Sequence, residues 1–444
     1  MSNHVHDLYL SLKPRLLVNL LGKVRYSSLY GNAFYLMLNS VVTSLLGFVF
    51  WNIMARFFPP AQVGIGSALV AASMLVGALA NLGLGIGLIR FVPEAGEKAG
   101  RLINAAFTLA GAVAVAVSLI YLAGAGYWSP ALVFVRENVW LLALFVLFTT
   151  FTVLSALTDQ SLVAGRSARF VFWKNIIISL LKLPLPVFIF AHLRGYGIFA
   201  GTGTAILTGV LLSCFFFLPL VYRGYFPRPV WAGDMMKQML PYSFGNYMAN
   251  LLNGTPSIIY PLMVLNVLGP EKSAYFYIAW MMVMVLAMIP IGMAQSLFAE
   301  GSHDQCKLSQ NGRRALVFTL LLSIPAAGAM IGLSGWLLHF FGPGYAENGA
   351  GVVRFLALAV IPQCVNVLFI AINQVKKRVH LIIAQTGILS VISLGLGYYL
   401  LGKVGLNGIG MAYALAHFTV ALAVAWSLWR VLNEKQVAVV GESD

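Results

Sequence analysis

Acidic residues are scarce in this 444-residue sequence, which holds 13 Asp and Glu against 28 Lys and Arg. Charged residues of both signs make up only 9% of the chain, and 60% is hydrophobic. A soluble domain usually carries about 25% charged residues. The composition therefore excludes an ordinary soluble domain and indicates an integral membrane protein.

Motifs for nucleotide or metal chemistry are also lacking. There is no GxxxxGK[ST] loop, and no loop between the apolar runs is long enough for an ATPase domain. No nucleophile and base stand at a catalytic spacing, and His339, His380 and His417 are isolated. We therefore expect no enzymatic activity, no metal site and no cofactor. The cysteines give no disulfide framework and are expected to be inert: Cys214, Cys306 and Cys364.

Long apolar runs are what the sequence does have. A membrane-spanning helix needs about 20 mainly apolar residues, and twelve runs of that length are separated by short loops that hold nearly all the charge. We expect an all-α polytopic membrane protein with about twelve transmembrane helices. The expected spans lie near residues 32–54, 63–89, 102–122, 139–158, 170–192, 197–222, 240–267, 274–299, 315–338, 351–373, 380–401 and 408–431.

The distribution of Lys and Arg predicts the orientation in the membrane. Both termini and the loops after even-numbered spans hold 21 of the 28 basic residues, counting Lys174 among them, while the opposite side holds six and only Lys182 is left over. Basic residues favour the cytoplasmic side, so both termini are expected there. The net charge of +15 then reflects topology, and no nucleic-acid partner is implied. No cleavable signal peptide is evident, and residues 8–26 are expected to form an interfacial helix.

The two halves of the chain resemble each other at an offset of about 210 residues, as in transporters built from parallel repeats. The matching pairs are Pro60 with Pro270, Gly195-Tyr-Gly-Ile198 with Gly405-Leu-Asn-Gly-Ile409, and Arg166 with Lys376. We expect two six-helix lobes with the substrate between them. The predicted segments are an N-terminal stretch 1–28, an N-lobe 29–223, a cytoplasmic loop 224–237, a C-lobe 238–432 and a tail 433–444.

Lys182 is the one basic residue expected deep inside a span, about 12 residues from either end. At about 1.5 Å per residue it would lie about 18 Å from each interface, too far for its side chain to reach water by snorkelling. Asn175, Ser179, Lys182 and Pro186 are spaced as one helical face, so we interpret the stripe as a cavity wall that meets an anion.

Amide side chains form further stripes along other expected spans. Two interpretations stay open for them: a shared cavity that contacts a substrate, or hydrogen bonds between helices. The stripes are Asn32, Tyr35 and Asn39 in the first span, Asn246, Asn250 and Asn253 in the seventh, and Gln363, Asn366 and Asn373 in the tenth, with Arg354 at its outer end.

No Asp or Glu is expected well inside a span, since Asp159 and Glu300 fall at cytoplasmic ends. A cavity for cationic drugs normally needs a buried carboxylate. The fixed charge here is positive, which favours a substrate with phosphate or carboxylate groups. Arg56 and Arg90 stand at opposite ends of the first two spans, where snorkelling is the alternative to a substrate contact.

Two stretches resemble the polysaccharide, or O-antigen, flippase family of the multidrug/oligosaccharidyl-lipid/polysaccharide exporter superfamily. They are Ala55-Arg-Phe-Phe-Pro-Pro-Ala-Gln-Val-Gly64 and Asn81-Leu-Gly-Leu-Gly-Ile-Gly-Leu-Ile-Arg-Phe-Val-Pro-Glu94. The stretches Phe341-Gly-Pro-Gly-Tyr345 and Gly405-Leu-Asn-Gly-Ile409 are similar to later loops of that family, and the likeness runs over about residues 28–432. The chain departs from 14-span members by having twelve spans, and it has Pro-Ala-Gln where an acidic residue often follows the proline.

The resemblance implies a V-shaped transporter that moves undecaprenyl-diphosphate-linked glycans from the cytoplasmic to the outer leaflet of a bacterial inner membrane. It also implies a cationic central cavity, onto which Arg56, Arg90, Lys182 and Arg354 are carried over by position. Membrane lipid, and with it a polysaccharide polymerase and glycosyltransferases, would be the partners of such a flippase. The expected substrate-binding residues are Lys182, Arg56, Arg90, Arg354, Asn39, Asn246, Asn250, Asn253 and Asn366.

Two other functions fit the same spans. A cation-coupled multidrug antiporter of the same superfamily is the first alternative, and the missing intramembrane carboxylate weighs against it. A membrane scaffold for glycan-synthesis enzymes is the second, and the short loops leave little surface for such partners.

Overall fold

A computed structural model describes residues 28–231, 233–303 and 307–433. Those residues form helices joined by short turns, with no strand among them. The helices of the first half are α2 (Ser28–Phe57), α3 (Pro60–Ala80), α4 (Leu84–Phe91), α5 (Ala99–Ala123), α6 (Ala125–Trp128), α7 (Phe134–Glu137), α8 (Val139–Ala164), α9 (Ala168–Leu181), α10 (Gly195–Leu212) and α11 (Leu218–Val221). The second half contains α12 (Gly233–Leu268), α13 (Pro270–His303), α14 (Leu308–His339), α15 (Pro343–Val375), α16 (Val379–Val404) and α17 (Leu406–Leu432).

Twelve of the described helical segments are long and apolar enough to cross a membrane, which confirms the expected number of spans. Their starts follow local chemistry. Pro60, Pro270 and Pro343 each stand at the first position of a helix, where a missing N–H costs nothing. Asn138 caps α8 by accepting the backbone N–H groups of Trp140 and Leu141 at 2.9 and 3.3 Å.

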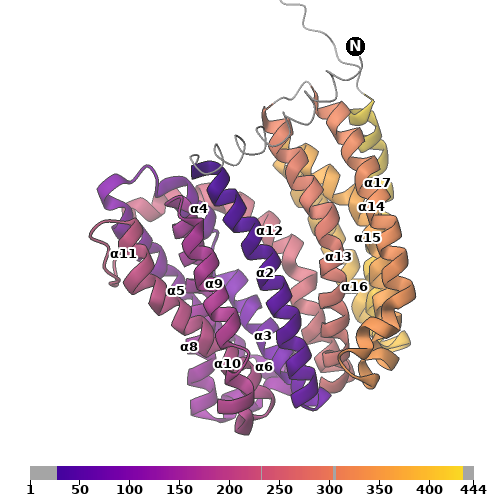
Figure 1. The fold of residues 1–444 in the computed structure, drawn as a ribbon, viewed down its shortest axis with the longest axis horizontal. Coiled ribbons are helices and arrows are strands. Elements are labelled where there is room, and N and C mark those ends of the chain that lie inside the picture. The colour runs from indigo at the N-terminus through magenta and orange to yellow at the C-terminus, as the bar shows by residue number, and fades with distance from the viewer. Residues whose placement is uncertain (1–27, 232, 304–306, 434–444) are drawn as a thin grey trace, which may run out of the picture.

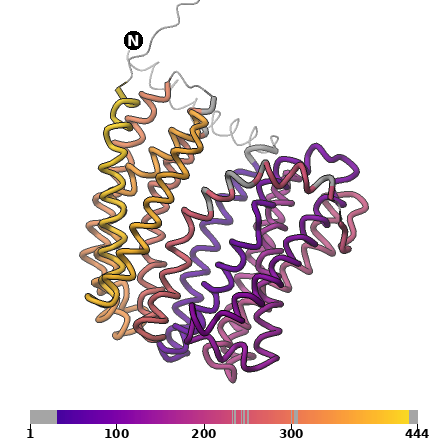
Figure 2. The backbone as a smooth tube through the Cα atoms, turned by 180° about the vertical axis from the view of Figure 1, so that it is seen from behind, coloured from indigo at the N-terminus to yellow at the C-terminus, as the bar shows by residue number. Residues whose placement is uncertain are grey.

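The helices form two lobes, which we name the N-lobe (α2 to α11) and the C-lobe (α12 to α17). Figure 1 shows the two lobes side by side, close together at the end where α2 finishes and farther apart at the opposite end. Figure 2 shows the same divergence from behind. The N-lobe contacts the C-lobe mainly through α3, which packs against α13 and α12.

An aromatic cluster joins the lobes at their close end. Phe50 and Trp51 of α2 are buried among C-lobe side chains, and the Trp51 ring lies 4.6 Å from that of Tyr277 in α13. Gly64 in α3 is needed there, because a Cβ at this position would lie 1.7 Å from the backbone oxygen of Pro270. We call this region, built from the last turns of α2 and the starts of α3 and α13, the lobe junction.

The expected repeat is visible in the backbone. Arg166 and Lys377 both adopt left-handed φ angles, 52° and 56°, just before α9 and α16. Arg194 and Gly405 do the same, at 53° and 71°, before α10 and α17. Both pairs are 211 residues apart, so Arg166 corresponds to Lys377 rather than to Lys376.

Two expected spans are not continuous helices. The run expected over 63–89 is interrupted after Ala80 by a turn that contains Gly83, with a left-handed φ of 76°, before α4 begins. The run over 170–192 is interrupted at Lys182, because α9 ends at Leu181 and a single π-helical turn follows at Leu185–Ile189. The expected interfacial helix at 8–26 and the tail beyond 433 lie outside the described residues.

Candidate functional site

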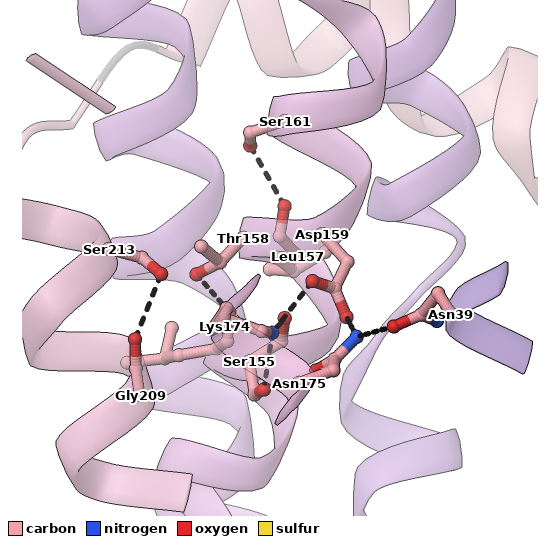
Figure 3. A network of polar contacts seen from close by, with 11 residues as sticks. Asn39, Ser155, Leu157, Thr158, Asp159, Ser161, Lys174, Asn175, Gly209 and Ser213 are labelled. Carbon is pink, nitrogen blue, oxygen red and sulfur yellow. Dashed lines mark hydrogen bonds and ion pairs between the residues drawn. The ribbon is translucent and has the colours of Figure 1, made fainter. Parts of the chain in front are cut away.

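A buried ion pair lies inside the N-lobe, between α8 and α9. The ammonium of Lys174, with 0% side-chain exposure, is 2.7 Å from a carboxylate oxygen of Asp159, which is 25% exposed. Lys174 also donates to the backbone oxygen and the hydroxyl of Ser155, at 3.0 and 2.8 Å (Figure 3). Three oxygens therefore compensate for the burial of one ammonium group, as a charge at this depth requires.

This pair corrects two expectations from the sequence. Lys174 was expected on the cytoplasmic side, but it is fully buried. It therefore does not belong among the basic residues that predict the orientation in the membrane. A carboxylate does reach into the N-lobe, since Asp159 lies in α8 five residues before the end of the helix and holds Lys174. The remaining basic residues still favour the same orientation.

A chain of amides continues from the ion pair to α2. Asn175 donates to the other carboxylate oxygen of Asp159 at 3.5 Å and to the side-chain oxygen of Asn39 at 3.2 Å (Figure 3). About two helical turns toward the N-terminus of α2, Asn32 accepts the backbone N–H of Ala168 at 2.9 Å. The first-span stripe thus makes hydrogen bonds between helices, which is the second of the two interpretations left open for it.

Lys182 lies at the break in the fifth span. It is half-buried, it follows the last residue of α9, and its ammonium stands 5.1 Å from the centre of the Phe50 ring in α2. Phe50 belongs to the lobe junction. Lys182 has no acidic partner among the described residues, in contrast to Lys174.

The predicted four-residue face around Lys182 is not one surface. Asn175 points to α2, whereas Ser179 is 4% exposed inside the N-lobe. Pro186 is buried against α10, where a Cβ on Gly201 would lie 2.6 Å from its ring. Because the helix ends at Leu181, helical spacing no longer relates Lys182 to Pro186.

The three predicted arginines lie in different places. Arg56, at the end of α2, donates to the backbone oxygen of Phe340 in the C-lobe at 3.0 Å, less than two helical turns beyond Phe50. Arg90 is exposed in α4 and forms an ion pair with Glu94. Arg354 is exposed in α15 and donates to Ser334 at 3.2 Å. Arg56 and Lys182 therefore share the lobe junction, and the described contacts bring neither Arg90 nor Arg354 to it.

The C-lobe contains a polar pocket of about 230 Å³ among α12, α13, α15, α16 and α17. We call it the C-lobe pocket. Asn366, a predicted site residue, lies in its wall, and so does Gln363 from the same stripe, but Asn373 bonds to the backbone of its own helix instead. The remaining polar or aromatic members of the wall are Asn253, Ser257, Trp280, Gln385, Thr386, Tyr413 and His417.

A chain of hydrogen bonds holds the wall of the C-lobe pocket in place. The amide of Gln385 donates to the side-chain oxygen of Asn366 at 3.3 Å, and the amide of Asn366 lies 3.1 Å from Nδ1 of His417. The Asn366 amide also donates to the backbone oxygen of His417 at 2.9 Å. Three helices, α15, α16 and α17, are fixed to one another by this chain.

The seventh-span stripe is described only in part. Asn253 is exposed and lines the C-lobe pocket. Asn246 and Asn250 belong to α12, and their side chains lie outside the described part of the chain.

A second cavity, of about 550 Å³, lies between the lobes, where α12 faces α3, α4 and α8. Its polar wall residues are Asn81, Thr152, Gln160 and Tyr247, and small residues such as Gly77 and Ala78 leave room for it. Tyr247 donates to the backbone oxygen of Leu79 across the lobes at 3.1 Å.

Comparison with known proteins gives the family. A family model described as "Polysaccharide biosynthesis protein" matches residues 53–347. A protein of Shigella flexneri named "Putative O-antigen transporter" is 26% identical over 209 residues. That match covers 43% of this chain, and the chain spans about half the length, 47%, of that curated relative.

Solved structures show the same fold. The lipid II flippase MurJ in an inward closed conformation superposes with a TM-score of 0.70 at 15% identity, covering 89% of each chain. An inward-facing multidrug resistance MATE transporter of the MOP superfamily superposes with a TM-score of 0.66 at 14% identity, covering 88% of this chain and 94% of the other. The likeness confirms a multi-pass membrane protein with the two-lobe transporter fold.

Proposed function

Because this chain belongs to the polysaccharide biosynthesis protein family, we propose that it is a flippase for a polyprenyl-diphosphate-linked oligosaccharide. It would carry this cargo from the cytoplasmic to the outer leaflet of a bacterial inner membrane, for assembly of a cell-surface polysaccharide. In that membrane both termini are cytoplasmic, as the basic residues favour. Undecaprenyl is the prenyl class that the family resemblance implies.

Lys182 is the observation that carries the proposal. A cation that is half-buried at the break of a membrane span and lacks an acidic partner among the described residues is costly to keep, at about 2.5 to 3.5 kcal/mol on insertion scales. The face of Phe50 offsets part of that cost through a cation–π contact. A diphosphate would offset more, because it brings an opposite charge and strong acceptors.

The position of Lys182 relates substrate binding to the movement of the lobes. The side chain stands over Phe50, which is packed in the lobe junction, and Arg56 of the same helix closes the junction through Phe340. A diphosphate drawn to Lys182 would compete with the C-lobe carbonyl for Arg56. We propose that this competition loosens the junction and favours opening on that side, while the prenyl tail stays in lipid.

A deletion strain and a matched set of lysine variants test the function. Deletion should make a lipid-linked oligosaccharide accumulate on the cytoplasmic leaflet, because synthesis continues while export is blocked. Lys182→Ala should fail to relieve that accumulation at wild-type protein level, whereas Lys98→Ala, at an exposed loop position, should relieve it fully. If the Lys182→Ala variant exports the glycan as well as wild type does, Lys182 does not provide the contact to the diphosphate.

A cation-coupled multidrug antiporter is a second candidate, and Asp159 is the observation that favours it. This carboxylate is 25% exposed inside the N-lobe, so the absence of such a group no longer counts against drug transport. Its charge is already balanced by Lys174, which leaves little attraction for a cationic drug. Overexpression that raises resistance to cationic drugs, with normal surface glycan after deletion, would favour the antiporter.

A further inference from the structure

The C-lobe pocket takes no part in the proposed diphosphate contact, and three of its buried polar atoms lack a partner. They are Oε1 of Gln363, Oε1 of Gln385 and Nε2 of His417, on side chains that are 7%, 5% and 4% exposed. Buried polar groups are nearly always hydrogen-bonded in native proteins. Three unpaired atoms, on side chains that line one pocket from three helices, therefore indicate a site for a ligand.

The hydrogen-bond chain decides which of these atoms are donors. The amide nitrogen of Asn366 can only donate, so Nδ1 of His417, 3.1 Å away, must accept. A neutral imidazole then carries its proton on Nε2, which makes that atom the free donor. The two glutamine oxygens are acceptors. The pocket thus offers two acceptors and one donor, the pattern that neighbouring hydroxyl groups of one molecule can satisfy, because each hydroxyl both donates and accepts.

Size and aromatic walls restrict the ligand further. A pocket of about 230 Å³ has the volume of about eight waters, at about 30 Å³ each, which suits one sugar ring and excludes a whole oligosaccharide. Trp280 and Tyr413 line it with their rings 5.1 Å apart. The apolar C–H face of a sugar can pack on such rings by dispersion.

The lack of charged residues in the wall of the C-lobe pocket favours a neutral sugar over charged ligands. Among the described residues that line the C-lobe pocket, none is a Lys, Arg, Asp or Glu. A phosphate or an acidic sugar would lack a compensating cation, and a metal ion would lack a carboxylate. A neutral, hydroxyl-rich group satisfies the walls without leaving a buried charge.

Two wall residues of the C-lobe pocket are exposed. Asn253 of α12 and Ile291 of α13 are exposed members of its wall, and α12 and α13 are the C-lobe helices that pack against α3 of the N-lobe. We propose that the C-lobe pocket binds one neutral sugar residue of the transported glycan and so contributes to cargo selection. This inference rests on the proposed flippase function and adds a second contact, distinct from the diphosphate contact at Lys182.

Two lipid probes and one pair of isosteric variants test the inference. The probes are the lipid-linked glycan extracted from the deletion strain and sugar-free undecaprenyl diphosphate, each titrated into the purified full-length protein in nanodiscs. Gln363→Met keeps the side-chain volume and removes the unpaired oxygen, while Gln374→Met is the matched control at an exposed position of the same helix. His417→Phe keeps the ring beside Tyr413 and removes the Nε2 donor together with the Nδ1 acceptor, while the bond from the Asn366 amide nitrogen to the backbone oxygen of residue 417 can remain.

Gln363→Met should weaken glycan binding about tenfold, or about 1.4 kcal/mol, and should leave the binding of undecaprenyl diphosphate unchanged. His417→Phe should do the same, and Gln374→Met should change neither. Equal binding of the glycan by Gln363→Met, His417→Phe and wild type would overturn the sugar pocket and leave the flippase proposal standing. A deletion strain that accumulates no lipid-linked glycan would overturn the flippase proposal, and the sugar pocket with it.

Discussion

The ion pair between Lys174 and Asp159 makes a quantitative prediction about stability. Lys174→Met keeps most of the buried stem of the side chain and removes only the ammonium group. Asp159 would then face the N-lobe interior without its cation, and the Ser155 hydroxyl and carbonyl would lose a donor. The amide of Asn175, at 3.5 Å, is the main protein group left to Asp159.

The size of the effect follows from the exposure of the two partners. Breaking a fully buried ion pair by removing one partner costs about 3 to 5 kcal/mol. Water reaches part of Asp159, which is 25% exposed, so about 2 to 3 kcal/mol is expected here. The double variant Lys174→Met with Asp159→Asn leaves no uncompensated charge, and it should regain at least about 1 kcal/mol of that loss.

The stability of both variants can be measured by heating the purified proteins and running size-exclusion chromatography after each heating step. The single variant should lose its monodisperse peak several degrees below wild type, and the double variant should lie between them. Arg101→Met, at an exposed position of α5, is the control for removing a basic residue and should behave as wild type. A single variant as stable as wild type, or a double variant less stable than the single one, would refute the assignment of Lys174 and Asp159 as a stabilising pair.

Three further predictions concern the lobe junction. Gly64→Ala should lower stability by about 1 to 3 kcal/mol and separate α3 from α13 in spin-label distance measurements, because its Cβ would lie 1.7 Å from the backbone oxygen of Pro270; an unchanged distance would contradict this. Arg56→Ala removes the exposed, charged donor of the hydrogen bond to the Phe340 backbone oxygen, which should make opening of the lobe junction easier by about 1 kcal/mol. Cysteine probes at the junction should then be labelled about fivefold faster; equal labelling would contradict this. Lys182→Arg should keep partial glycan export, since the charge remains but its shape and hydration change, and Lys182→Glu should be inactive by repulsion of phosphate; equal export by the Glu variant and wild type would make Lys182 structural.

The sequence predicts features that depend on composition and on local chemistry. Twelve spans follow from the length of the apolar runs, since a lipid environment enforces helices of that length. The repeat is visible because Pro60 and Pro270 start equivalent helices. Asn366 is predicted as a site residue because polar groups inside spans are rare, and the structure has it in the wall of a pocket.

Features that depend on contacts between helices were missed, although one had a signal. Asp159 and Lys174 lie at similar distances from the turn that joins α8 to α9, so a helical hairpin brings them together. The break at Lys182 also has a local cause, because Pro186 has no N–H to donate to the Lys182 carbonyl and Pro184 disfavours helix at the residue before it. Gln385 and His417 had no such signal, since they become neighbours only when three helices pack.

Transport of the glycan in a defined membrane tests the central claim most directly. The purified protein would be placed in liposomes that hold the lipid-linked glycan extracted from the deletion strain, and a glycan-cleaving enzyme outside would report the fraction exposed on the outer leaflet. Liposomes with wild-type protein should expose the glycan faster than empty liposomes do, and liposomes with Lys182→Ala should not. Exposure at the same rate in empty liposomes, wild-type liposomes and Lys182→Ala liposomes would contradict the claim that this chain is a flippase for lipid-linked glycans.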